Sequence, residues 1–287
     1  MRFDIVSDPV KVARIQKRLA NRERRLVAAR GALAGYEMPA LPNAFPRLSR
    51  VLASSPHGAR FTGIHYHIRS PHRKIELLFP AADYPKFVFR AVADRRYAIE
   101  LGLRRLADLE RWIERYYKEI QEPSQRTERP SFGVVDKVYA LKAEIGNILL
   151  LVRGGLDTVA TLLHFLNGPT SALFRSFAAF VNDLKKPHAA GAGVDPALQA
   201  YVEGHLEWFR ILREYHDYVT QYGSIDISFY EPSEGAVRTY LQDALQVHEM
   251  VAPVQAGLDS FCEFVDGHFA ARIAGTPEAS YGSGLEA

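Results

Sequence analysis

The stretch from His205 to Gly223 gathers residue types that can carry acid–base chemistry on a phosphate. Its polar residues of interest are Arg210, Arg213, His216 and Asp217. A histidine titrates near neutral pH, so its imidazole can accept a proton from a hydroxyl or donate one to a leaving oxygen. A guanidinium stabilises the extra negative charge of a phosphate in the transition state. These residue types therefore suit acid–base chemistry at a phosphate group.

The same stretch is expected to be a helix that ends at Gly223. Its apolar seam steps by four and three residues through Trp208, Leu212, Tyr215, Val219 and Tyr222. Asp195 and Pro196 supply a side-chain cap and a first-turn proline, which predicts where this helix begins. His216 falls at the edge of the seam, where a hydrogen-bonded structural histidine is the alternative to a catalytic one.

A structural role is also open for the charged residues of this cluster. Arg213 and Asp217 are one helical turn apart, so they can form a surface pair that contributes a few tenths of a kcal/mol. A charged helix often carries an arginine within six residues of a histidine, and the motif by itself has little specificity.

The segment from Leu212 to Gly223 resembles the HEPN superfamily, and the resemblance extends over about residues 134–269. Proteins of that superfamily are α-helical bundles, commonly dimeric, and many are metal-independent RNases of toxin and defence systems. Their signature is an arginine, usually followed by a polar residue, and then a histidine after four to six intervening residues. The resemblance implies a helical bundle, a homodimer, and RNA or a nucleotide as ligand.

Two registers of this signature fit the chain differently. Aligned on Tyr222-Gly223, the family's arginine falls on His216, its polar residue on Asp217 and its histidine on Gln221. Gln221 cannot transfer a proton, so this register predicts a degenerate member. A shifted register keeps Arg210 and His216 with five residues between them, and an active site then needs His216 for proton transfer.

The composition is that of a water-soluble globular protein. The 287 residues are 47% hydrophobic and 24% charged, enough for one large domain or two modest ones. The charged start of the chain lacks the apolar core of a signal peptide, which predicts a cytoplasmic protein, and we expect no membrane-spanning segment. The single cysteine, Cys262, excludes an internal disulfide and is expected to be a buried apolar residue.

Positive charge is concentrated at the N-terminal end of the sequence. Residues 1–74 contain 15 Lys and Arg but only 4 Asp and Glu, whereas the remainder is net acidic. Ser7-Asp8-Pro9 predicts the start of a helix with apolar residues at heptad spacing from Val12. The candidate phosphate-binding residues on this helix are Arg14, Lys17, Arg18, Arg22 and Arg25. The alternatives are a solvated helix face and internal pairing with the acidic remainder of the chain.

Two alternating runs, Ile64–Ile68 and Ile75–Phe79, predict a β-hairpin. His65 and His67 share one strand face in this hairpin. Histidines spaced i, i+2 can chelate zinc, but no neighbouring thiolate or carboxylate completes the set, so we predict an exposed basic face and no metal site.

The predicted fold class is mainly α, a bundle of long helices with a small N-terminal β-hairpin. Predicted helices cover 83–122, 134–166, 170–186 and 195–222, and a last helix begins at Ser233. Gly154-Gly155 marks a kink or a close helix crossing in the second of these. The predicted domains are residues 1–80, the basic helix and hairpin; residues 81–272, the bundle; and residues 273–287, a disordered tail.

Three functions follow as hypotheses. The first is a HEPN-like bundle with weakened catalysis that binds RNA, a nucleotide or a protein partner. The second is an active metal-independent RNase of toxin or defence type. The third is a helical scaffold that binds no nucleic acid. The sequence has no Walker-type glycine loop, no Gly-x-Ser-x-Gly elbow and no His-Glu-x-x-His helix, so we predict no cofactor.

Overall fold

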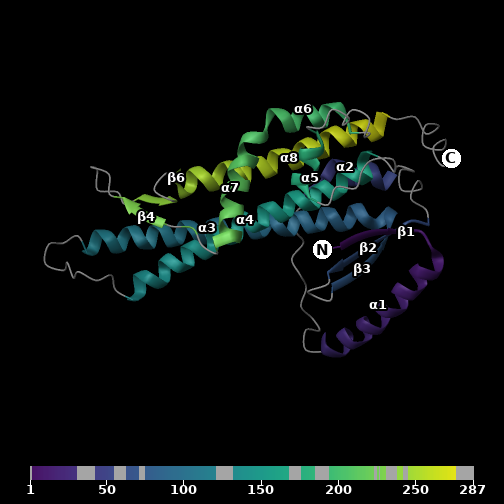
Figure 1. Ribbon diagram of the computed structural model, residues 1–287, viewed down its shortest axis with the longest axis horizontal. Helices are drawn as coiled ribbons and strands as arrows, with labels where there is room; N and C mark the ends of the chain where they lie inside the picture. Colours follow the sequence, from purple (N-terminus) through teal and green to yellow (C-terminus); the bar gives the residue numbers. More distant parts are fainter. Residues whose placement is uncertain are drawn as a thin grey trace. The chain divides into compact units, whose positions relative to one another are not determined.

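A computed structural model of the chain has eight α-helices and two small antiparallel sheets in the part of the sequence that it describes (Figure 1). The described residues are 2–30, 43–54, 63–70, 75–120, 132–167, 176–184, 194–222, 225, 227–230, 238–241 and 245–275. The mainly α fold with an N-terminal hairpin is confirmed. Residues 1–93 with 263–287 form one compact unit and residues 94–262 form a second. The sequence-based boundary near residue 80 stays a prediction.

The first unit contains a three-stranded antiparallel sheet. Its strands are β1 (Arg2–Val6), β2 (His65–Ser70) and β3 (Ile75–Pro80), in the order β1-β2-β3. The predicted hairpin is β2 and β3, in which His67 lies opposite Leu78. Strand β1 was not predicted, because five residues are too few to establish a period of two.

Helix α1 (Pro9–Arg30) lies beside this sheet (Figure 1). Its predicted start is confirmed, since the Val10 amide donates to Asp8 Oδ1 at 2.9 Å. Val12 and Ile15 are buried, and α1 packs against β3. Over residues 9–21 the other side chains are exposed except for the half-buried Leu19, as expected of a helix with one apolar stripe.

The other face of β2 packs on helix α3 (Tyr84–Ile120). The rings of Tyr66 and Tyr84 are 4.3 Å apart, and burial raises the pKa of the Tyr66 phenol to about 12. Helix α2 (Pro46–Ser54) is fixed to helix α8 (Val247–Gly275) by Asp266. The buried Asp266 carboxylate accepts hydrogen bonds from the amides of Arg47 and Leu48, at 3.2 and 2.8 Å, and so caps α2 from a distant part of the chain.

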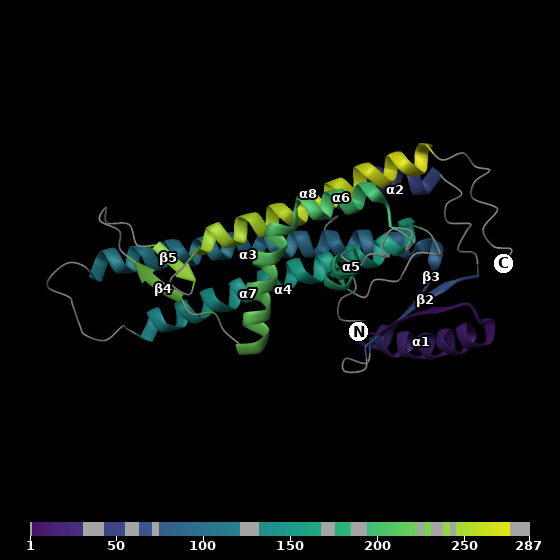
Figure 2. The ribbon, with the colours of Figure 1, turned by 45° about the horizontal axis from the view of Figure 1, so that its top comes forward.

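The second unit is built around helix α4. It contains residues 94–120 of α3 and residues 247–262 of α8. Its other elements are α4 (Phe132–Asn167), α5 (Phe177–Leu184), α6 (Pro196–Gly204), α7 (Leu206–Tyr222), β4 (Ile227–Tyr230), β5 (Arg238–Leu241) and β6 (Leu245–Gln246). Leu141, Ile145, Leu149, Val152 and Leu156 of α4 are fully buried, as the apolar stripe of this helix predicts. Helix α7 runs across α4 in both views (Figure 1 and Figure 2).

Helix α4 is also the one described helix that passes a length and composition test for crossing a membrane, over Val135–Asn167. The sequence prediction had excluded any such segment. Within its most apolar window, 61% is buried inside the protein, and core helices of water-soluble proteins pass the same test.

Two predicted helices differ from those observed. The helix expected from Asp195 to Tyr222 is broken at His205, whose φ of −123° and ψ of 23° are not helical, and α6 and α7 run in different directions. The last helix begins at Val247, so the predicted start at Ser233 is wrong. The residues after Ser233 include β-branched and aromatic types that favour strands, and they supply β5.

The predicted disordered tail, residues 273–287, is wrong for residues 273–275, which belong to α8. Ile273 is buried within α8, which ends at Gly275, and residues 276–287 lie outside the described part.

Glycines set the closest helix contacts in the second unit. A Cβ at Gly257 of α8 would lie 2.1 Å from Trp208 Cδ2 of α7, so the rigid indole occupies the space that a side chain would need. Gly146 of α4 faces α7 at an ordinary distance, because a Cβ there would lie 3.4 Å from Val219 Cγ1. Both are interior helix glycines, yet only Gly257 is required by packing.

We predict opposite effects for the same substitution at these two glycines. Gly257→Ala should lower the free energy of unfolding by about 1–3 kcal/mol, because the indole must be displaced. Gly146→Ala should raise it by about 0.5–1 kcal/mol, because alanine loses less backbone entropy in a helix. Urea unfolding followed by circular dichroism measures both values. Equal stabilisation by the two substitutions would contradict the assigned contact.

Candidate functional site

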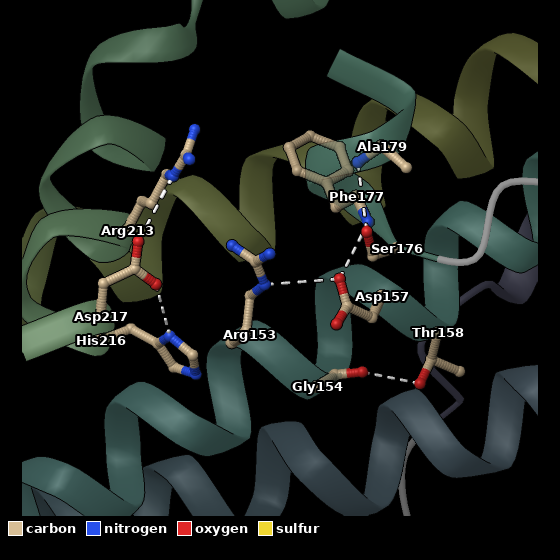
Figure 3. A network of polar contacts seen from close by, with 10 residues as sticks. All are labelled: Arg153, Gly154, Asp157, Thr158, Ser176, Phe177, Ala179, Arg213, His216 and Asp217. Carbon is tan, nitrogen blue, oxygen red and sulfur yellow. Dashed lines mark hydrogen bonds and ion pairs between the residues drawn. The ribbon is translucent and has the colours of Figure 1, made fainter. Parts of the chain in front are cut away.

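Three of the four residues predicted for catalysis are connected on α7. His216 Nδ1 lies 3.2 Å from Asp217 Oδ1, and Arg213 Nε lies 3.5 Å from Asp217 Oδ2 (Figure 3). The His216 side chain is 18% exposed, whereas the Asp217 side chain is 46% exposed. Asp217 therefore links a mostly buried imidazole to a guanidinium at the surface.

The fourth residue, Arg210, belongs to a different contact. Its Nη1 lies 3.1 Å from Glu207 Oε2, one turn earlier on α7, and both side chains are largely exposed. Arg210 thus forms a surface pair of the kind expected on any charged helix. One register of the family signature requires Arg210 and His216 to act together. Arg210 instead pairs with Glu207, and His216 contacts Asp217, so the structure does not support that register.

His216 lies on the face of α7 that packs against α4. Phe209, seven residues earlier on that face, has Arg153 Cζ 5.5 Å from its ring centroid. Val219, three residues later, faces Gly146. Since 3.6 residues make one helical turn, His216 falls between these two contacts along the same side of α7. We call this contact region the α4–α7 seam.

Arg153 was missed in the sequence analysis. Its side chain is only 15% exposed, and its Nε lies 3.4 Å from Asp157 Oδ1 without forming a hydrogen bond. Both Nε and Nη1 are buried and have no hydrogen-bond partner among the described residues. The available signal was a charged residue at the end of the apolar run Leu149–Val152, directly before Gly154-Gly155.

Asp157 has a structural task of its own. Its Oδ1 accepts a hydrogen bond from the Phe177 amide at 2.8 Å, and Ser176 Oγ accepts one from the Ala179 amide at 3.1 Å (Figure 3). The two side chains thus cap the first turn of α5, where backbone amides have no helical acceptor. Because Asp157 is shared with α5, it compensates the Arg153 charge only in part.

A second arginine, Arg95 of α3, lies against the Gly154-Gly155 pair. A Cβ on Gly154 would lie 3.2 Å from Arg95 Nε, so these glycines make room for the arginine side chain. Helix α4 continues through them, and of the two predicted alternatives the close approach is the one observed. Burial lowers the pKa of Arg95, and the negative charges of Asp94 and Asp157 oppose that lowering.

The basic face of α1 is the second candidate site. Lys11, Arg14 and Lys17 are exposed, and none has an ion pair among the described residues. Arg18 forms an ion pair with Glu76 of β3 while half of its side chain remains exposed. Arg22 and Arg25, the other residues predicted to bind phosphates, lie on the helical backbone of α1, and their side chains are outside the described part.

The predicted exposed histidine face of the hairpin is wrong for His67. Its side chain is buried, and its Nε2 lies 2.8 Å from Glu76 Oε1, the carboxylate that also pairs with Arg18. The reason is that α1 packs against β3, which a hairpin considered alone could not indicate. No group of three or more His, Cys, Asp or Glu in the described part of the chain is arranged to hold a metal ion.

The predicted burial of Cys262 is confirmed, since the side chain is almost fully inaccessible. Comparisons of the chain with protein-family models, with curated proteins and with solved structures found no match.

Asp157 and Asp217 provide a matched pair of substitutions. Asp157→Ala should lower the free energy of unfolding by about 2–4 kcal/mol, because α5 loses a cap and Arg153 loses its nearest carboxylate. Asp217→Ala should lower it by less than about 1 kcal/mol, because its partner Arg213 remains hydrated. Urea unfolding of both variants tests this. A loss at Asp157 no larger than that at Asp217 would show that Arg153 does not depend on Asp157.

Proposed function

We propose that this chain is a HEPN-like helical-bundle protein that binds RNA through the basic face of α1 and has weakened or no catalytic activity. The observation that carries the proposal is the run of exposed cations on α1, Lys11, Arg14 and Lys17, with no carboxylate paired to them among the described residues. Over its 22 residues, α1 contains eight Lys and Arg and a single acidic residue, Glu23.

Repulsion explains why such a face suits a polyanion. Like charges three or four residues apart on a helix destabilise it by a few tenths of a kcal/mol per pair. Lys11, Arg14 and Arg18 have this spacing, which the sequence continues at Arg22 and Arg25. A phosphate backbone removes the repulsion and releases its own condensed counterions, so the same charges that destabilise α1 favour RNA binding.

The contacts on α7 favour binding without cleavage. Asp217 engages both His216 and Arg213, which lowers the positive charge that Arg213 can offer to a transition state. In the register set by Tyr222-Gly223, the family's histidine is replaced by Gln221, which cannot transfer a proton. Both arguments support a degenerate site.

An active RNase is the second candidate function, and one contact favours it. A carboxylate at Nδ1 of a histidine fixes the tautomer and the orientation of the ring, which leaves Nε2 for proton transfer. The His216–Asp217 contact has this form. We therefore include cleavage among the outcomes of the test below.

The test is a titration of the full chain with single-stranded RNA at several salt concentrations. The logarithm of the binding constant should fall linearly with the logarithm of salt concentration. Combined substitution of Lys11, Arg14 and Lys17 by alanine should reduce that slope by about 2, since each phosphate contact contributes about 0.7 for a single strand. The control replaces three exposed arginines of α3 by alanine, Arg104, Arg111 and Arg115, and should leave the slope unchanged.

Each alternative gives a distinct result in this experiment. Absence of saturable RNA binding at every salt concentration would reject the proposal and favour a protein scaffold. Equal loss in the α1 variant and the α3 control would assign binding to net charge instead of α1. RNA cleavage that disappears in His216→Ala would establish the RNase and reject the degenerate site.

A further inference from the structure

Arg153 presents a physical problem within the α4–α7 seam. Moving a charged guanidinium out of water costs several kcal/mol unless hydrogen bonds and an opposite charge compensate for the lost hydration. Here Nε and Nη1 are both buried without an acceptor in the described part of the chain. The neighbouring carboxylate, Asp157, already accepts a hydrogen bond from the amide of Phe177. The Arg153 guanidinium thus has Asp157 as an ion-pair partner, but Nε and Nη1 have no hydrogen-bond acceptor among the described residues.

Arg153 and His216 belong to the two helices that face each other across the α4–α7 seam. Arg153 Cζ lies 5.5 Å from the centroid of the Phe209 ring, within the range of a cation–π contact. Figure 3 shows Arg153 between Asp157 on one side and the His216–Asp217 pair on the other. His216 comes from the facing helix, and its Nδ1 is directed to Asp217. Two groups that can donate to an anion are thus held on facing helices by separate contacts.

We propose that the α4–α7 seam binds a phosphate group, with Arg153 as its principal ligand and His216 as the second. A phosphate suits these donors better than a carboxylate does, because its oxygens are arranged tetrahedrally and accept from several directions. Arg153 can contribute Nε–H and Nη1–H, and His216 can contribute Nε2–H. This site is separate from α1 and does not depend on RNA binding by that helix.

The proposal explains why an arginine is present where an apolar residue would pack as well. Replacing a buried ionic group by an apolar residue of similar volume is often neutral or stabilising. Arg153→Met should therefore leave the protein at least as stable as the wild type in the absence of phosphate. A purely structural arginine, required for the cap of α5 through Asp157, would instead make this variant less stable.

The experiment is calorimetric titration of the full chain with inorganic phosphate and, separately, with AMP, at constant ionic strength maintained with chloride. We expect saturable binding to the wild-type protein. Arg153→Met should raise the Kd at least about tenfold, the effect of losing charge-assisted hydrogen bonds. The control, Arg104→Met, removes the same charge from an exposed pair with Glu100 and should leave the Kd unchanged. The tighter of the two probes identifies free phosphate or a nucleotide as the source of the group.

Three results would overturn the proposal. These are no saturable binding of either probe to the wild-type protein, binding that persists in Arg153→Met, and equal weakening in Arg104→Met. If Arg153→Met does not fold, Arg153→Lys replaces it; this variant keeps the charge but loses the Nε–H and Nη1–H donors and should also bind at least about tenfold more weakly. The variant lacking Lys11, Arg14 and Lys17 should bind phosphate as the wild type does, which separates this site from the proposed RNA surface.

Discussion

Positive charge that neighbouring carboxylates compensate only in part is the constraint that the proposed sites share. On α1 the cations are exposed and repel one another, whereas at Arg153 the donors are buried and lack acceptors. The energetic cost differs between the two sites. Water and salt screen the repulsion among the exposed cations of α1, whereas burial removes hydration from the Arg153 guanidinium. An anionic ligand relieves both, and this is why a polyanion is proposed for α1 and a single phosphate group for the seam.

The rest of the fold holds these charges in place with apolar contacts and shared carboxylates. Helix α1 uses Val12 and Ile15 to pack on the sheet, which leaves its cationic side toward solvent. Within the second unit, Gly154 admits Arg95 and Gly257 admits Trp208, so helices approach closely where side chains are absent. Two aspartates, Asp157 and Asp266, cap the short helices α5 and α2 from other parts of the chain. Each therefore makes local helix formation depend on tertiary packing.

Sequence patterns predicted the long helices, the hairpin and the start of α1, because hydrophobic period and capping residues are local signals. They failed where structure depends on distant contacts. His67 looked exposed because nothing in the hairpin sequence indicates that α1 will pack on it. The sequence did not predict a role for Arg153, because its neighbours form an apolar stripe. The burial of its Nε and Nη1 depends on the packing of α4 against α7, which the sequence of α4 does not indicate. The break at His205 was also missed, since the apolar seam continues on both sides of it.

The central claim is that RNA lies along α1, and chemical footprinting of lysines tests it most directly. The full chain is acetylated with and without saturating RNA, and the modified lysines are quantified by mass spectrometry. Lys11 and Lys17 should become protected by RNA, while Lys86, whose side chain is 79% exposed on α3, should react equally in both samples. Unchanged reactivity of Lys11 and Lys17 in the presence of bound RNA would contradict the claim.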